Sequence, residues 1–195
     1  MTIDPKDTRR RILGVAEALM RSGGPAAVTF DRVAGRLGLT KQAVIYWFPT
    51  KSDLLAEIAL PGLRAEAAAV IAAVRAAATP CDAARALVQA VTRFHRDDLD
   101  RFRLLYVAPQ TAPQRAKAYA FVDRVHPVTG EMYGAVAAAL GDGPDARADA
   151  VALHMAALGH VLMVALTEAI DDPLAHSPAR LADRLARLVA DGCTA

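Results

Sequence analysis

One stretch decides the fold of this chain: residues Thr29–Lys51 read TFDRVAGRLGLTKQAVIYWFPTK. Thr29 is a capping residue in front of a short amphipathic pattern, because its side-chain oxygen can accept from the first N–H groups of a helix. Gly38 ends that pattern, and a second capping residue, Thr40, follows almost at once. Two short helices must therefore meet at a steep angle across one tight turn, which is a helix-turn-helix.

The apolar positions of these two helices, 30–37 and 41–48, fall on facing sides. The inward set consists of Val33, Ala34, Leu37, Leu39, Val44 and Phe48. The second helix leaves outside the side chains of Lys41, Gln42, Ala43, Ile45 and Tyr46. The pattern therefore predicts a small shared core and a second helix with one free face.

The flanking segments complete this module. The segment 7–20 has an apolar stripe long enough to cover the helix-turn-helix, and Ser22–Pro25 ends it with two glycines and a proline. A fourth helix follows and meets Pro61–Gly62, where a proline removes one backbone hydrogen bond. We expect a bend there, and we divide the chain into a helix-turn-helix domain, 1–51, and a second helical domain, 52–195.

Composition favours helices throughout. Hydrophobic residues make up 54% of the 195 residues and aromatic residues only 5%, with alanine carrying most of the excess. Small side chains let helices approach closely, and no run of alternating β-branched residues suggests a strand. We expect an all-α fold of about nine helices, one of which, 114–140, is interrupted at His126–Pro127.

Charge is divided unevenly along the chain. Residues 1–51 carry nine Lys or Arg against four Asp or Glu, a net charge of +5, whereas the remainder has 14 against 17, a net charge of −3. The basic surplus lies with the helix-turn-helix, which indicates a polyanionic partner for that end. Arg9–Arg11 either add non-specific attraction or form a solvated turn.

Several features favour a cytoplasmic protein. The N-terminal residues lack the apolar core of a secretory signal, and Cys81 and Cys193 are too few and too far apart for a disulfide framework. The segment Ala150–Thr167 carries no formal charge over eighteen residues, the lower limit of a membrane span. We reject the span, because its alanines, glycine and two histidines suit a helix buried within an oligomer.

The order of residues in the second helix points to a family. Thr40 is followed by the run Val44–Trp47, then by Phe48 and by Lys51. Over about the first 55 residues this order resembles the TetR family of bacterial transcription regulators, although Ile45 stands where many members have tyrosine. The resemblance implies a dimeric regulator whose C-terminal helices bind a small molecule, which moves the fourth helix and misaligns the two recognition helices on DNA.

Binding of double-stranded DNA by this module requires the second helix in the major groove. We expect Lys41 to read guanine and Gln42 to read adenine. Ala43 and Ile45 are expected to touch thymine methyl groups. Trp47 is expected to lie partly in the core of the module and partly against the DNA backbone. The residues expected to hold phosphates are Thr29, Thr40, Tyr46 and Lys51.

No catalytic or metal-binding set emerges. His154 and His160 are six residues apart, on different sides of a helix, and lack the i, i+4 spacing of paired metal ligands. Cys81 has no histidine nearby in the sequence, and Asp97–Asp98 beside His95 reads as a solvated helix end. We therefore expect no enzyme activity, no metal and no cofactor.

An aromatic and methionine-rich set suits a pocket for a small apolar effector. Its expected lining consists of Phe94, His95, Phe102, Tyr106, Gln110, Tyr119, Met132 and Tyr133. Ordinary core packing accounts for each of these residues equally well when they are taken singly.

The last two helices offer a surface for a second copy of the chain. The helix that contains Ala150–Thr167 is apolar on two faces, one for its own core and one for a partner. The expected homodimer interface consists of Met155, Leu158, Gly159, Leu162, Leu166, Leu181, Leu185 and Leu188. A dimer doubles the DNA contacts of one module, so it can read a palindrome.

The sequence thus favours a dimeric repressor that binds a palindromic operator and releases it when a small apolar molecule binds. One alternative is a DNA-binding regulator without a small-molecule inducer. Another is a helical-bundle carrier or enzyme whose N-terminal module is structural, which the missing acid, base, metal and phosphate-loop patterns disfavour.

Overall fold

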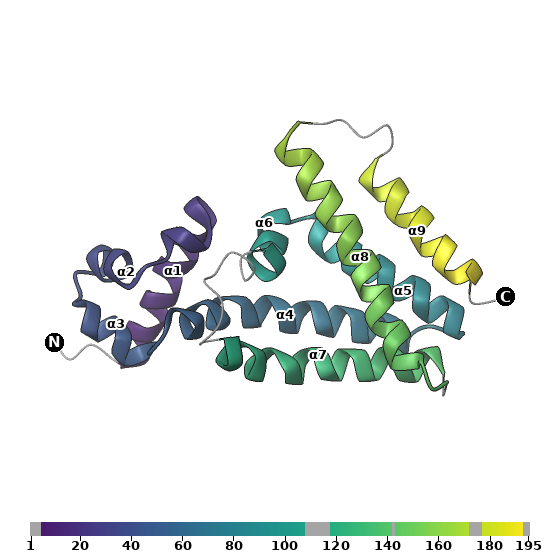
Figure 1. Ribbon diagram of the computed structural model, residues 1–195, viewed down its shortest axis with the longest axis horizontal. Helices are drawn as coiled ribbons and strands as arrows, with labels where there is room; N and C mark the ends of the chain where they lie inside the picture. The colour runs from purple at the N-terminus through teal and green to yellow at the C-terminus, as the bar shows by residue number, and fades with distance from the viewer. Residues whose placement is uncertain (1–4, 108–117, 142, 172–176, 193–195) are drawn as a thin grey trace. The chain divides into compact units, whose positions relative to one another are not determined.

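The computed structural model describes residues 5–107, 118–141, 143–171 and 177–192, and within them every regular element is helical, as predicted (Figure 1). The helices are α1 (Pro5–Ala27), α2 (Phe30–Leu37), α3 (Lys41–Trp47), α4 (Lys51–Arg75), α5 (Pro80–Arg96), α6 (Leu99–Phe102), a π-helical turn η1 (Arg103–Val107), α7 (Ala118–Leu140), α8 (Ala146–Ala169) and α9 (Pro178–Gly192).

These elements form two compact units. The described residues within Met1–Leu63 and Asp100–Pro127 make up the first unit, and those within Arg64–Leu99 and Val128–Ala195 make up the second. The division falls inside α4, at the first residue of α6 and inside α7, so each of these three helices contributes residues to both units.

The first unit packs α1, α2 and α3 around a small core of large apolar side chains. Phe48, Ile12 and Leu54 are fully buried there together with Val33 and Val44. α1 leaves helical geometry at Gly23 and Gly24, as expected from the glycines that end its amphipathic pattern. The three-helix module predicted from the sequence is therefore present.

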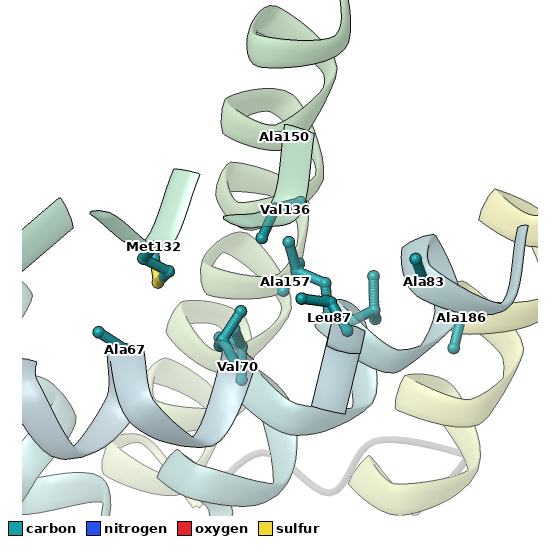
Figure 2. Close-up of a cluster of buried hydrophobic side chains, with 12 residues drawn as sticks. Ala67, Val70, Ala83, Leu87, Met132, Val136, Ala150, Ala157 and Ala186 are labelled. Carbon is teal, nitrogen blue, oxygen red and sulfur yellow. The ribbon is translucent and has the colours of Figure 1, made fainter. Parts of the chain in front are cut away.

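The second unit is built on smaller side chains. Its buried cluster, to which α4, α5, α7, α8 and α9 contribute, includes five alanines among twelve residues. Figure 2 shows Val70, Leu87, Val136 and Ala157 converging from four of these helices. α5 packs against both α8 and α9. The alanine-rich composition thus becomes a bundle in which the helices approach closely.

Two prolines stay inside continuous helices. α7 passes through Pro127 without a break, so the predicted interruption at His126–Pro127 is wrong. α4 passes through Pro61 in the same way. Both prolines are exposed, so the ring lies on the solvent side, where a backbone carbonyl that lacks its helical donor can bind water instead. The division into domains at residue 51 stays a prediction.

α8 is long and apolar enough to cross a membrane by length and composition. A single such helix is weak evidence, because a core helix of a soluble protein passes the same test. In this chain α8 packs against α5 and α9, and its buried residues include Ala150, Ala157 and Val161.

Candidate DNA-binding site

The turn between α2 and α3 is held by side-chain caps. The hydroxyl of Thr29 accepts a hydrogen bond from the backbone N–H of Arg32 at 3.2 Å, and that of Thr40 accepts from the N–H of Ala43 at 3.2 Å. Gly38 lies between them with a φ of 65°, a left-handed conformation that favours glycine. The predicted helix-turn-helix is therefore formed by local hydrogen bonds.

The free face of α3 carries the side chains predicted to contact DNA. Lys41, Gln42 and Tyr46 are exposed, with Tyr46 at 79% the most exposed large hydrophobic residue described. Ala43 and Ile45 are half-buried. These residues share one side of a helix that Val44 and Phe48 fix to the core.

Trp47 has the divided position expected from the sequence. It is half-buried and packs against the core of the first unit. Its ring meets the exposed ring of Tyr46 edge to face, with centroids 5.3 Å apart. An indole held in this way is anchored on one side and reaches solvent on the other.

The lysines at the start of α3 and at the start of α4 make different contacts. Lys41 forms an exposed ion pair with Asp31, with Nζ 2.9 Å from the carboxylate oxygen, and such pairs contribute little to stability. Lys51 is half-buried and donates from Nζ to the backbone carbonyl of Pro25 at 2.6 Å. Burial lowers the pKa of Lys51 below its ordinary value. Lys51 therefore ties the start of α4 to the end of α1. The hydrogen bond to Pro25 also holds the ammonium group in one place.

Arg9 has a role that the sequence did not reveal. Its guanidinium lies 5.4 Å from the centre of the Phe48 ring, and Nη2 is 2.6 Å from a carboxylate oxygen of Glu57. The other carboxylate oxygen of Glu57 lies 2.8 Å from Nη1 of Arg124. Arg9 thus joins α1 to α4 and is not part of a merely solvated turn.

The residues predicted to line an effector pocket fall in different parts of the chain. Phe102 and Tyr106 belong to the first unit, where their ring centres are 5.6 Å apart. The members that belong to the second unit are Phe94, His95, Met132 and Tyr133. Gln110 and the side chain of Tyr119 lie outside the described residues.

The second unit contains a buried polar cluster around a glutamate that sequence reasoning missed. Glu66 is 1% exposed, and its two carboxylate oxygens lie 3.3 Å from Nε2 of His95 and 3.1 Å from Nε2 of His154. The Tyr133 hydroxyl lies 2.7 Å from Nδ1 of His154. A proton on Nε2 of His154 lets that ring donate to Glu66 and accept from Tyr133.

The pKa of Tyr133 agrees with this arrangement. Burial raises it, the nearby charge of Glu66 raises it further, and Arg147 lowers it in part. The tyrosine therefore stays protonated and donates to His154 at neutral pH. Glu66 had a signal in the sequence, because it interrupts the buried stripe formed by Leu63, Ala67 and Val70 on α4.

The residues of the expected dimer interface are apolar and accessible on α8 and α9. Met155, Leu162, Leu166 and Leu188 are exposed, as is Gly159. The members that are half-buried are Leu158, Leu181 and Leu185. Two further apolar residues are exposed that the sequence did not indicate: Met163 on α8, beside Leu162, and Ile170, which directly follows α8.

Within the described ranges, no group of three or more His, Cys, Asp or Glu residues is arranged to hold a metal ion. His154 is the hydrogen-bonded interior histidine that its sequence context predicted.

A family comparison agrees with this site. Residues 12–58 match the model described as bacterial regulatory proteins of the tetR family. The matched range includes all of α2 and α3 and the turn between them. No match was found among curated protein sequences.

Solved structures share the fold along the whole chain. The multidrug binding protein EbrR, complexed with imidazole, is 26% identical, with 95% of this chain and 90% of that chain covered and a TM-score of 0.62. A tetR-family regulatory protein from Rhodococcus RHA1 is 21% identical over 94% and 95%, with a TM-score of 0.63. The fatty acid degradation regulator FadR from Bacillus halodurans is 12% identical over 98% of both chains, with a TM-score of 0.66.

The capped helix-turn-helix, the free face of α3 and the helical remainder define a helix-turn-helix transcription regulator. Residues 12–58 therefore carry the DNA-binding module of the tetR family, as the sequence predicted, and the rest of the chain shares the helical fold of the similar structures.

Proposed function

We propose that this regulator is a dimeric repressor that binds a palindromic operator and leaves it when a small, largely apolar molecule binds. The observation that carries the proposal is the free face of α3, where Lys41 and Gln42 stand exposed directly after the Thr40 cap. Side chains at the N-terminal end of such a helix are the ones that reach base edges in the major groove.

The surroundings of α3 suit the phosphates on either side of the groove. Thr29 and Thr40 start two helices, whose first N–H groups favour anions. Lys51 and the exposed hydroxyl of Tyr46 flank the same helix in sequence. The net charge of +5 on residues 1–51 adds an attraction to DNA that does not depend on its sequence and that salt weakens.

Dimerisation is supported by the apolar side chains that α8 and α9 leave in solvent. Met155 is 65% exposed, Leu162 48%, Leu166 50% and Leu188 55%. A group of large apolar side chains of this kind is typical of an interface between proteins. We expect the protein to sediment as a dimer at micromolar concentration, whereas a monomer would contradict the proposed reading of a palindrome.

A small-molecule effector is supported by the family and by two of the similar structures. EbrR is described as a multidrug binding protein, and FadR as a regulator of fatty acid degradation. In this chain, Phe94, Met132 and Tyr133 of the second unit supply aromatic and methionine side chains of the type that bind apolar ligands. The protein would act in the cytoplasm, where its DNA is found.

The experiment compares two substitutions on the DNA-binding face. Gln42→Ala should relax discrimination at one base pair of each half-site by about 1–3 kcal/mol, because a base contact is lost. Lys51→Ala should weaken binding to all sequences alike and reduce the salt slope by about 1, because a phosphate contact is lost. Fluorescence of Trp47, the only tryptophan, reports binding to upstream-region DNA.

The controls separate binding from folding. Arg187→Ala removes an exposed charge on α9 and should leave DNA affinity unchanged. Urea unfolding of Lys51→Ala measures the loss of the contact to Pro25. If Gln42→Ala and Lys51→Ala behave identically, the division into reading and positioning residues is wrong. No fluorescence response to any upstream-region DNA would contradict the proposed function.

A further inference from the structure

A cavity of about 220 Å³ lies among α5, α8 and α9 of the second unit. One wall is a stripe of α5 at helical spacing, formed by Gln89, Thr92, Arg93 and Arg96. The wall contributed by α8 and α9 includes Val161, Val164 and Ala182. A polar wall therefore shares the cavity with an apolar one.

The polar stripe runs along the edge of the apolar face of α5, which is buried at Leu87 and Val91. Thr92 is buried within the stripe, whereas Arg93 and Arg96 are exposed and can meet a ligand that enters from solvent. Within the described part of the chain, the guanidinium of Arg93 makes no ion pair. The ion pair of Arg96 in the same part is with the exposed Asp97, where Nε lies 3.4 Å from Oδ1.

The charges around the cavity leave a positive excess. Arg93 and Arg96 contribute two positive charges, and Asp183 on α9 contributes one negative charge. His160 also lines the cavity, and burial lowers its pKa, with a hydrogen bond to the backbone of Pro178 opposing the shift. His160 is therefore neutral at pH 7, and the two arginines make the net charge of the cavity lining positive.

The start of α9 adds to this field. Pro178 and Ala179, the first residues of α9, line the cavity, and the hydroxyl of Ser177 accepts from the N–H of Arg180 at 3.2 Å. α9 has 15 residues, so its dipole favours an anion at this end. This effect supplements the two guanidinium groups, which supply the charge-assisted hydrogen bonds.

We propose that this cavity binds a small organic carboxylate, whose charged group meets Arg93 and Arg96 and whose apolar body lies against Val161, Val164 and Ala182. Water occupies about 30 Å³ per molecule in the liquid, so the cavity equals roughly seven waters and suits a ligand the size of benzoate. The site shares no residue with the aromatic set proposed for the apolar effector. Binding here does not depend on the proposed function, and only its effect on DNA does.

The test is calorimetric titration of the full-length protein with benzoate and with benzamide. Benzamide has the same shape and lacks the charge, so it should bind at least about tenfold more weakly than benzoate. Arg93→Gln should weaken benzoate binding by roughly tenfold or more for the same reason. Arg187→Gln removes an equal charge from the exposed surface of α9 and should leave benzoate binding unchanged.

A second variant tests the cavity itself. Ala182→Leu places a larger side chain in the space and should abolish benzoate binding, with circular dichroism to verify that the helices remain. Failure of benzoate to bind at millimolar concentration would overturn the proposal, as would equal affinity for benzamide or equal losses in Arg93→Gln and Arg187→Gln. If benzoate binds and leaves the DNA complex intact, the site stands but does not control DNA binding. DNA binding without benzoate tests the regulator proposal separately.

Discussion

The two units of the molecule differ in whether they bury polar side chains: the buried polar residues among those described, Glu66, Thr92, His95, His154 and Thr167, all lie in the second unit. In the first unit the ion pairs are accessible: the side chains of Arg9 and Glu57 are 40% and 28% exposed. In the second unit Glu66 and His95 are only 2% and 0% exposed. Both glutamates lie on α4, so one helix carries the same residue type in water and in a core.

The cores differ in a related way. Phe48, Ile12 and Leu54 fill the first unit and fix α3 firmly, so that its free face is presented in one orientation. The second unit is rich in alanine, and its helices come close enough for side chains from α4, α5, α7 and α8 to meet around Glu66. The first unit therefore leaves the polar side chains of α3 free for recognition, whereas the second unit encloses a set of polar side chains around Glu66 in addition to its exposed charges.

The largest expected effect tests that contrast directly. Glu66→Ala removes the carboxylate between two buried imidazoles, and each buried polar group left without its partner costs about 1–3 kcal/mol. Glu57→Ala, on the same helix, removes an accessible carboxylate and should cost less than about 1 kcal/mol. Urea unfolding of both variants measures the difference. Equal losses would show that burial does not separate the two units in the way described.

The helix-turn-helix was predictable because its signals are local. Thr29, Gly38 and Thr40 each act on groups within five residues, so their order in the sequence defines the turn. The dihedral of Gly38 and both caps follow from that order. Proline was less informative, because its effect depends on which side of the helix it faces: Pro127 is exposed, and α7 continues through it.

The polar cluster was not predictable in the same way. Glu66 and His154 are 88 residues apart, and no local sequence pattern around either residue predicts that they are in contact. The Arg9–Glu57 pair spans 48 residues and was missed for the same reason. Aromatic residues likewise indicate a pocket by type but not by position, so Phe102 and Phe94, predicted together, belong to different units.

A smaller effect compares one capping threonine from each unit. Thr40 caps α3, and Thr79 caps α5 by accepting from the N–H of Asp82 at 3.1 Å. Removal of either hydroxyl by Thr→Ala should cost about 1 kcal/mol of unfolding free energy. Only Thr40→Ala should also weaken DNA binding, because only that cap lies beside the recognition face. Urea unfolding and DNA titration of both variants test this, and equal losses of DNA affinity would contradict it.

The smallest expected effect concerns acid. Burial lowers the pKa of His160 below its ordinary value of 6.5, so the folded second unit binds this proton less readily than the unfolded chain. Its contribution to stability is therefore complete above about pH 6.5 and is lost as the pH falls toward the lowered pKa. His160→Gln should reduce the change in unfolding free energy between about pH 5.5 and 7.5, compared with the unsubstituted protein. Urea unfolding of both proteins at the two pH values measures this change, and an equal change in both would contradict the assignment.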